Sequence, residues 1–415
     1  MFQILNDIRM KLARSNILFF CLFFLVIFYP FEGLLLNHFG VELAIIRWFF
    51  ALSVDILILS YIIRPNNHND YNGLKIFYYL FLVWSIFLLF KTIPDILSNQ
   101  YKLKLFITNS LVISLFPFLL NYNFDIHYIK RMIRLFSKIS IFIILVFVTC
   151  PFVFSSGVTM EYLSYAFATP IGMLVLLSPY EKNTRKTFFH LIILLFFLVS
   201  CISFGRRAAT LYILFFFVGT FVLNFNMISR DKYLLCQKRK NLLPIFIIVI
   251  IFFILCAVFS QNITYILERF DTGFESREGP IEEFLYDFNK AQDWLTGRGY
   301  VGEIMGGVLA TTDQGTRFGI ESGWLTLILH GGIPYALLIL ILCIEAIINA
   351  LKSNNLLCKS LGLFIFYMII DMTGFGVQFV NIKTVLFYIA ISCCHSKYLL
   401  KLNNDDIIKY IYVLY

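Results

Sequence analysis

The sequence predicts an all-α protein that crosses a membrane about twelve times. Hydrophobic residues make up 60% of the 415 residues and charged residues only 14%, against about 25% in an average soluble chain. The 48 Phe and 23 Tyr are more than a soluble fold of this length could bury. The apolar residues form continuous runs that do not alternate with polar ones, which excludes a β-barrel.

Each expected span is an apolar run long enough for an α-helix to cross the ~30 Å hydrocarbon core at about 1.5 Å per residue. The first run follows Arg9, Lys11 and Arg14. It is too long for the core of a signal peptide and no small-residue cleavage site follows it, so we expect an uncleaved first span. The twelve runs cover residues 17–36, 43–63, 74–93, 105–121, 139–157, 163–179, 187–204, 208–226, 242–260, 323–348, 361–380 and 384–400.

The formal net charge of +9 is interpreted as membrane topology and not as nucleic-acid binding. Lys and Arg gather before the first run and in alternate connecting segments, such as 130–138 and 230–240. The positive-inside rule therefore places both termini in the cytoplasm. Seven of the nine Cys lie within apolar runs, so neither a disulfide framework nor a CxxC metal site is expected.

The polar segment 261–322 is then one large external loop, between nine spans in residues 1–260 and three spans with a cytoplasmic tail in residues 323–415. Loops of this length are usually functional or disordered. Apolar residues at helical spacing predict an amphipathic helix over 281–295, with Pro280 at the first helical position. We expect this helix to lie on the membrane face or to roof a cavity; the alternative is a helix that only caps the bundle.

Motifs of soluble enzymes are absent. The sequence has no Walker A, HExxH or Rossmann motif and its six His are scattered, so no metal or cofactor is expected. The candidates are therefore charges at membrane depth or at the outer face. Arg206 and Arg207 interrupt two apolar runs at their outer turn, against the positive-inside pattern. The guanidinium fork suits phosphate, so a pyrophosphate-bearing lipid of the outer leaflet fits them; headgroup anchoring is the alternative.

Two further outer segments contain an arginine. In Gly297-Arg298-Gly299 the glycines predict a tight turn that lets the backbone approach a ligand, with an ordinary loop turn as the alternative. Arg317 and Glu321 lie four residues apart just before the span 323–348. They form either a simple ion pair or a phosphate ligand with a general base.

Charged residues also fall within the predicted spans or at their ends. Arg47 and Asp55 share one helix and Asp371 lies mid-span, where they either make structural polar contacts or line an aqueous cavity. Glu161 lies at an outer helix end and is a candidate to join the site. His330 lies about two turns into its helix and is expected to pack or hydrogen-bond there.

Three outer stretches and the span count together form a pattern. The stretches are Ser203-Phe204-Gly205-Arg206-Arg207-Ala208, Gly297-Arg298-Gly299-Tyr300, and Glu321-Ser322-Gly323-Trp324-Leu325 followed by Gly332-Ile333-Pro334. This pattern resembles the O-antigen polymerases of the Wzy type, within the wider group of O-antigen ligases and exopolysaccharide polymerases, and implies a GT-C-like membrane fold. The chain departs from the group at Glu321, where ligases and many exopolysaccharide members have His, and at Tyr335, where Gly is usual.

The resemblance implies a reaction at the periplasmic face of the bacterial inner membrane. The growing glycan on undecaprenyl pyrophosphate moves onto the non-reducing end of the next lipid-linked repeat unit. Preorganised cations stabilise the leaving pyrophosphate, so no metal is required. Arg206 and Glu321 are the expected catalytic residues, Glu321 as the base, with Glu161 as a weaker candidate for the base. The expected pyrophosphate- or glycan-binding residues are Arg207, Arg298, Arg317, Glu161 and Arg47.

The expected partners are the lipid-linked donor and acceptor glycans, membrane lipid, a chain-length regulator and a flippase. Two alternatives stay open. One is an O-antigen ligase, against which Glu321 in place of His counts. The other is a lipid-linked oligosaccharide flippase, for which we would expect symmetric halves with paired broken helices and no large external loop.

Overall fold

The computed structural model describes residues 75–106, 120, 124, 126–149, 157–181, 183–226, 264, 275–305, 315–320, 322–374 and 382–412. The predicted spans over 17–36, 43–63 and 242–260 lie outside these ranges, as does most of 105–121. These four spans, and hence the total of twelve, stay predictions.

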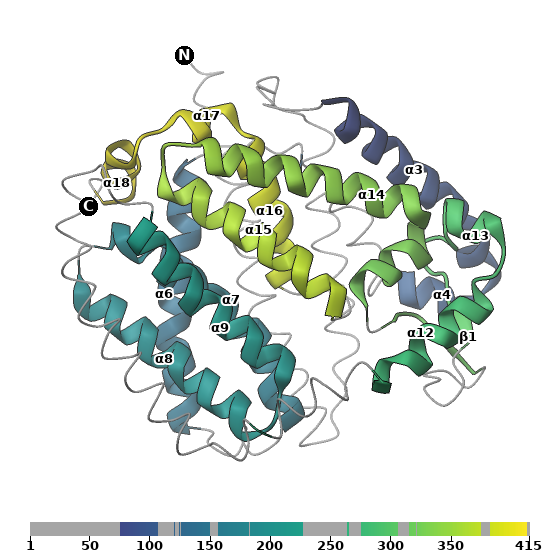
Figure 1. The fold of residues 1–415 in the computed structure, drawn as a ribbon, viewed down its shortest axis with the longest axis horizontal. Helices are drawn as coiled ribbons and strands as arrows, with labels where there is room; N and C mark the ends of the chain where they lie inside the picture. Colours follow the sequence, from purple (N-terminus) through teal and green to yellow (C-terminus); the bar gives the residue numbers. More distant parts are fainter. Residues whose placement is uncertain are drawn as a thin grey trace.

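The described chain is almost entirely helical (Figure 1), and its strands form one two-stranded ribbon. The elements are α3 (Lys75–Ser98), α4 (Gln100–Leu105), α6 (Ile126–Thr149), α7 (Gly157–Leu176), the 3-10 helix η3 (Ser178–Tyr180), α8 (Thr184–Ser203), α9 (Arg207–Asn226), α12 (Glu275–Asp287), α13 (Ala291–Thr296), β1 (Ile304–Met305), β2 (Thr316–Arg317), α14 (Gly323–Lys352), α15 (Leu356–Gly374), α16 (Ile382–His395), α17 (Lys397–Lys401) and α18 (Asn404–Tyr412). Five of them, α3, α8, α9, α14 and α15, are long and apolar enough to cross a membrane. The prediction of an all-α membrane protein is confirmed at this level.

The helix ends depart from the predicted runs where capping residues decide them. α8 and α9 agree with 187–204 and 208–226 to within three residues. The run 384–400 is divided between α16 and α17 at Ser396, whose hydroxyl accepts the Leu399 N–H and caps the second helix.

The bundle is built from two groups of helices that share one core. α7, α8 and α9 pack together, α14, α15 and α16 pack together, and α9 packs against α15 between the groups. α3 packs along α14, and α6 packs against α7 (Figure 1). Small residues permit the close approaches: Gly172 of α7 faces Phe216 of α9, and Gly362 of α15 faces Ala350 of α14. Small residues at helix contacts are typical of membrane bundles, because backbones can then approach closely.

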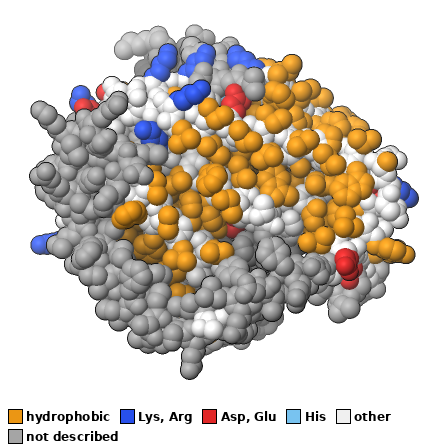
Figure 2. Space-filling model, viewed as in Figure 1, with side chains coloured by type: hydrophobic (Ala, Val, Ile, Leu, Met, Phe, Trp, Pro, Cys, Tyr) orange, Lys and Arg blue, Asp and Glu red, His pale blue; other side chains and the backbone are white. Residues whose placement is uncertain are grey.

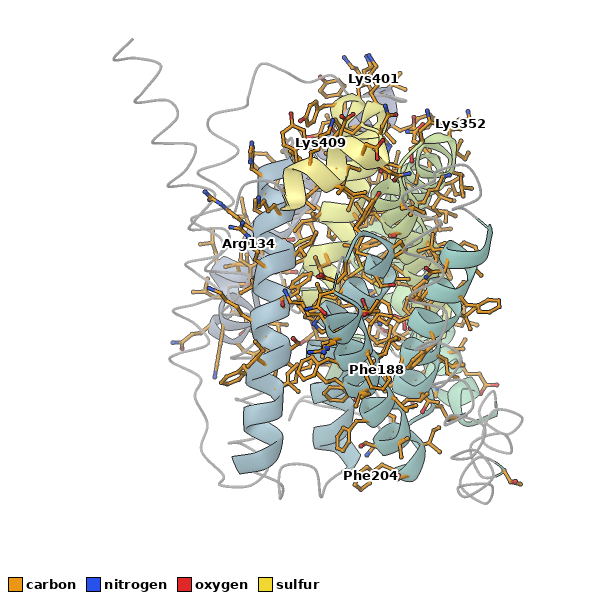
Figure 3. All side chains as sticks on the ribbon, turned by 90° about the vertical axis from the view of Figure 1, so that its left-hand side faces the viewer. Arg134, Phe188, Phe204, Lys352, Lys401 and Lys409 are labelled. Carbon is orange, nitrogen blue, oxygen red and sulfur yellow. The ribbon has the colours of Figure 1, made fainter. Side chains whose placement is uncertain are left out.

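The surface and the two ends of the bundle agree with a membrane location. Figure 2 shows apolar side chains spread across the middle of one face. The exposed large apolar side chains of the structure include Leu337 and Ile344 of α14 and Phe366 of α15. Lys and Arg gather at the upper edge of that face. In Figure 3, Lys352 and Lys401 lie at one end of the bundle and Phe204 lies at the opposite end. The predicted topology requires these groups to be on opposite sides, while the identity of the cytoplasmic side stays a prediction.

Helix α14 is broken, which we did not predict. Gly332 has a φ of 75° and a ψ of 175°, so the helical path stops there and resumes at once. Pro334 cannot donate a backbone hydrogen bond to the carbonyl of His330. The sequence Gly331-Gly332-Ile333-Pro334 thus opens main-chain carbonyls at membrane depth, and each must find another donor.

The predicted helix over 281–295 is wrong in two respects. The structure has two helices, because α12 ends at Asp287 and α13 begins at Ala291. The physical reason is that the Asp287 carbonyl accepts a hydrogen bond from the Arg298 guanidinium at 2.7 Å. Pro280 lies inside α12, which begins five residues earlier at Glu275.

Candidate functional site at the outer loop

The turn between α8 and α9 is the tight helical hairpin that the sequence predicts. Gly205 has a φ of 63°, its N–H bonds to the Ile202 carbonyl at 3.0 Å, and the Arg206 N–H bonds to the Cys201 carbonyl at 2.8 Å. These two bonds with a left-handed glycine form a Schellman motif, which ends α8 and starts α9 at once. Arg206 and Arg207 are both partly buried at this turn.

The polar segment 261–322, predicted to be the outer loop, contains the short ribbon of β1 and β2 near its end. Ile304 pairs with Arg317 and Met305 pairs with Thr316. Directly opposed residues point to the same face of an antiparallel pair, so Arg317 shares a face with Ile304. Ile304 is fully buried in a small apolar cluster with Phe284 and Phe288 of the α12 segment.

Arg317 is buried without a full set of hydrogen-bond partners among the described residues. It is 5% exposed, and its Nε and Nη2 have no hydrogen-bond partner in the part of the chain that the structure describes. Burying a charge without a partner costs on the order of several kcal/mol of folding free energy, because the ion loses its water, unless an opposite charge or a hydrogen-bond acceptor compensates it. The neighbouring Thr316 does have a partner, since its hydroxyl donates to Glu303 Oε2 at 3.0 Å.

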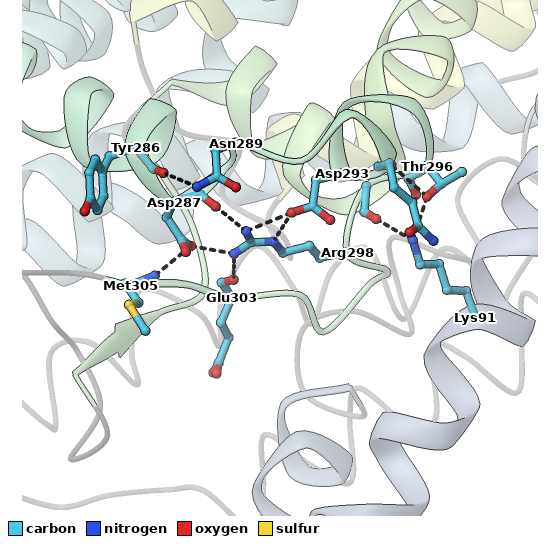
Figure 4. Close-up of polar contacts among 11 residues, drawn as sticks. Lys91, Tyr286, Asp287, Asn289, Asp293, Thr296, Arg298, Glu303 and Met305 are labelled. Carbon is cyan, nitrogen blue, oxygen red and sulfur yellow. Dashed lines mark hydrogen bonds and ion pairs between the residues drawn. The ribbon is translucent and has the colours of Figure 1, made fainter.

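Arg298 occupies a different environment, with a partner for every guanidinium N–H (Figure 4). Nη1 donates to Asp287 Oδ2 at 2.5 Å and to the Glu303 carbonyl at 2.9 Å. Nη2 donates to the Asp287 carbonyl at 2.7 Å and to Asp293 Oδ2 at 2.9 Å, and Nε also donates to Asp293 Oδ2. Burial lowers the pKa of Arg298, but the hydrogen bonds and charges of the two aspartates outweigh burial and raise it. In this conformation Arg298 has no free guanidinium N–H with which to bind pyrophosphate, the role expected for it from the sequence.

The turn that carries Arg298 is docked onto the broken part of α14. The Arg298 N–H bonds to the Leu329 carbonyl at 2.6 Å and the Gly299 N–H bonds to the His330 carbonyl at 3.0 Å. His330 Nδ1 lies 3.0 Å from the Gly299 carbonyl, so the predicted hydrogen-bonding role of His330 is confirmed. Gly297 has a φ of 62°, and a Cβ there would meet the backbone of His330.

Helix α3 closes the same junction from the other side, which sequence reasoning missed. Trp84 Nε1 donates to the Gly331 carbonyl at 2.8 Å, which satisfies the third acceptor at the break. Lys91 Nζ donates to Thr296 Oγ1 at 2.8 Å and to the Gly297 carbonyl at 2.5 Å (Figure 4). The distance of more than 200 residues along the chain hides these pairs from any local pattern.

Asp371 belongs to the bundle core. Its Oδ2 lies 2.5 Å from Lys383 Nζ and its Oδ1 accepts the Tyr367 hydroxyl at 2.7 Å, while Lys383 also lies 4.6 Å from the ring centroid of Tyr212. Of the alternatives for Asp371, the structure favours the structural polar contact. Lys383, which falls between the predicted spans 361–380 and 384–400, is buried in α16.

The remaining predicted site residues are Arg47, Glu161 and Glu321. Arg47 and Glu321 lie outside the described residues. Glu161 belongs to α7, and its backbone lies at the same end as Arg206, because the short connection from α7 to α8 makes these packed helices antiparallel. Its side chain is outside the description.

The two arginine-bearing turns lie away from the end of the bundle that holds Lys352. α14 ends at Lys352, opposite the Phe204 turn (Figure 3). The start of α14, with Arg317 just before it, lies at the other end of this broken helix. Arginine-bearing turns of this kind can bind an anionic group beside a membrane. A comparison of the chain with family models, curated proteins and solved structures finds no match.

Proposed function

We propose that the protein is a membrane glycosyltransferase that polymerises lipid-linked oligosaccharide repeat units. The growing glycan leaves undecaprenyl pyrophosphate and is joined to the acceptor hydroxyl of the next lipid-linked unit, at the periplasmic face of the inner membrane. Both termini are then cytoplasmic. The product is O-antigen or a related surface polysaccharide.

The observation that carries the proposal is the buried guanidinium of Arg317. A desolvated cation with two open donors, at the end of an apolar bundle, is suited to an anion that arrives on a lipid. The pyrophosphate leaving group is such an anion, and it gains charge as the glycosidic bond breaks. Fixed cations that meet this charge lower the barrier, because they need no reorganisation during the reaction.

The remaining roles follow from position. Arg206 and Arg207 lie on a hydrogen-bonded turn next to Phe204, opposite Lys352, and are proposed to share the pyrophosphate. Glu321, four residues after Arg317, is proposed as the base for the acceptor hydroxyl. A transporter would use a broken helix to bind its cargo with open main-chain groups, whereas the carbonyls at the break in α14 are bonded to Arg298, Gly299 and Trp84.

Deletion of the gene in its native host tests the proposal, with surface and membrane glycans separated on a gel. A polymerase predicts loss of the ladder and a single core-plus-one-repeat band. Bare core with long lipid-linked polymer retained in the membrane would make the protein a ligase. Bare core with no repeat units exposed outside would make it a flippase.

Complementation then assigns the residues. Arg206→Ala and Arg317→Ala are expected to leave the single-repeat band at normal protein levels. Arg185→Ala is the matched control, because Arg185 is exposed at the other end of α8. A normal ladder from Arg206→Ala and Arg317→Ala would contradict the proposed roles.

A further inference from the structure

We infer that Arg298 is a positioning residue that fixes Arg317 in place through the ribbon of β1 and β2. The inference rests on the proposed function, since it assigns a purpose to the placement of Arg317. It replaces the direct ligand role that the Gly-Arg-Gly pattern suggested for Arg298.

The first step is that Arg298 joins three parts of the loop. Its guanidinium bonds to Asp287 at the end of α12, to Asp293 in α13, and to the carbonyl of Glu303, which directly precedes β1. Five N–H groups in one rigid plane therefore set the relative positions of these segments. Arg298 with Asp287 and Asp293 carries a formal net charge of −1, so this group does not attract a further anion.

The second step is that the junction is anchored to the bundle by main-chain bonds. Arg298 and Gly299 donate to Leu329 and His330 at the break in α14, and Tyr300 N–H donates to Thr92 Oγ1 at 3.0 Å. Three glycines of the junction, Gly297, Gly299 and Gly332, have positive φ values and lie where a Cβ would meet a neighbouring segment. The loop is thus fixed to α14 and α3, and it cannot shift without opening these bonds.

The third step is that the Asp287 carboxylate links Arg298 to the ribbon that contains Arg317. Asp287 Oδ2 accepts from Arg298 and also from the Met305 N–H at 3.0 Å (Figure 4). Met305 belongs to β1, whose partner strand β2 ends in Arg317. The same carboxylate therefore holds Arg298 and the strand that is paired with Arg317.

Binding of undecaprenyl pyrophosphate to the purified full-length protein in nanodiscs tests the inference. Asp293→Asn replaces the carboxylate oxygen that accepts two bonds from Arg298 with a neutral amide, which weakens both bonds and also removes a negative charge. If the loop acted on the anion only through its charge, this variant would bind undecaprenyl pyrophosphate more tightly. The positioning role predicts the opposite, a dissociation constant about tenfold higher, which corresponds to about 1.4 kcal/mol. Lys290→Ala is the control, because Lys290 is an exposed cation of the same loop.

Two further variants separate positioning from other roles. Arg298→Lys keeps the charge but not the fork, so it is expected to bind as weakly as Arg298→Ala, whereas a direct ligand would be rescued by Lys. Arg298→Ala combined with Arg317→Ala is expected to bind no worse than Arg317→Ala alone, because both changes weaken the same contact, that between Arg317 and the pyrophosphate. The combination with Arg206→Ala is expected to multiply the two losses.

The outcomes separate the inference from the proposed function. Unchanged or tighter binding by Asp293→Asn overturns the inference and leaves the polymerase intact, provided that Arg317→Ala binds weakly. Unchanged binding by Arg317→Ala overturns both the inference and the role of Arg317. If Asp293→Asn does not fold, Thr92→Val takes its place, because it frees the Tyr300 N–H without a change of charge.

Discussion

The buried pair of Asp371 and Lys383 gives a prediction that needs no knowledge of the substrate. The side chains are 5% and 8% exposed and the charged atoms are 2.5 Å apart, so neither charge is solvated by water. Asp371→Asn leaves the ammonium group of Lys383 buried without its counter-charge. We expect the free energy of unfolding to fall by about 3–5 kcal/mol, the usual cost of breaking a buried pair from one side.

The double variant reveals whether the loss comes from the orphaned charge. Lys383→Met together with Asp371→Asn removes both charges and keeps most of the volume, so we expect a loss of about 1–2 kcal/mol. Tyr367→Phe removes the hydroxyl that donates to Asp371 and is expected to cost about 0.6–1.7 kcal/mol, as hydrogen bonds in membrane bundles do.

Equilibrium unfolding of the protein in detergent micelles by SDS, followed by circular dichroism, measures these losses. Thr373→Val is the matched control, because Thr373 is an exposed residue of the same helix. Equal losses in the single and the double variant would refute the reasoning, since the cost would then come from packing and not from an unpaired charge.

Three other predictions follow from the loop and the topology. Gly332→Ala is expected to destabilise the protein by about 1–3 kcal/mol, because a Cβ at this positive φ meets the backbone of Leu295; the same unfolding titration measures it. Phe284→Ala empties a fully buried position and is expected to cost the loop about 3–5 kcal/mol, seen as faster protease cleavage of the loop than in wild type. An impermeant maleimide applied to spheroplasts is expected to label Lys290→Cys, and to label Lys401→Cys only after permeabilisation. Reversed labelling would invert the topology.

The sequence predicted those helix ends that depend on residues within a few positions of the end. The hairpin at Arg206 follows from two apolar runs separated by Gly205-Arg206-Arg207, because glycine after a helix end takes the left-handed conformation at little cost. The break in α14 also has a local signal, in Gly331-Gly332-Ile333-Pro334, although we did not predict a break there. Glycine readily adopts a positive φ and proline has no N–H to donate, so this stretch indicates main-chain carbonyls without a partner inside the helix.

Tertiary contacts decided the features that the sequence did not predict. The end of α12 depends on Arg298, eleven residues downstream, whose guanidinium takes the carbonyl that the next turn would use. A glycine-flanked arginine looks the same whether it meets a ligand or two aspartates. Only the placement of Asp287 and Asp293 separates these cases, because together they occupy the guanidinium that a ligand would need.

The order of the chain gives the break in α14 a consequence for biogenesis. An open carbonyl in lipid costs several kcal/mol, so a broken helix enters the membrane at a penalty unless its donors are already present. The donors to Leu329, His330 and Gly331 come from Arg298, Gly299 and Trp84, and each of them leaves the ribosome before the carbonyl that it serves. The interrupted helix is therefore synthesised after every donor that makes its insertion tolerable.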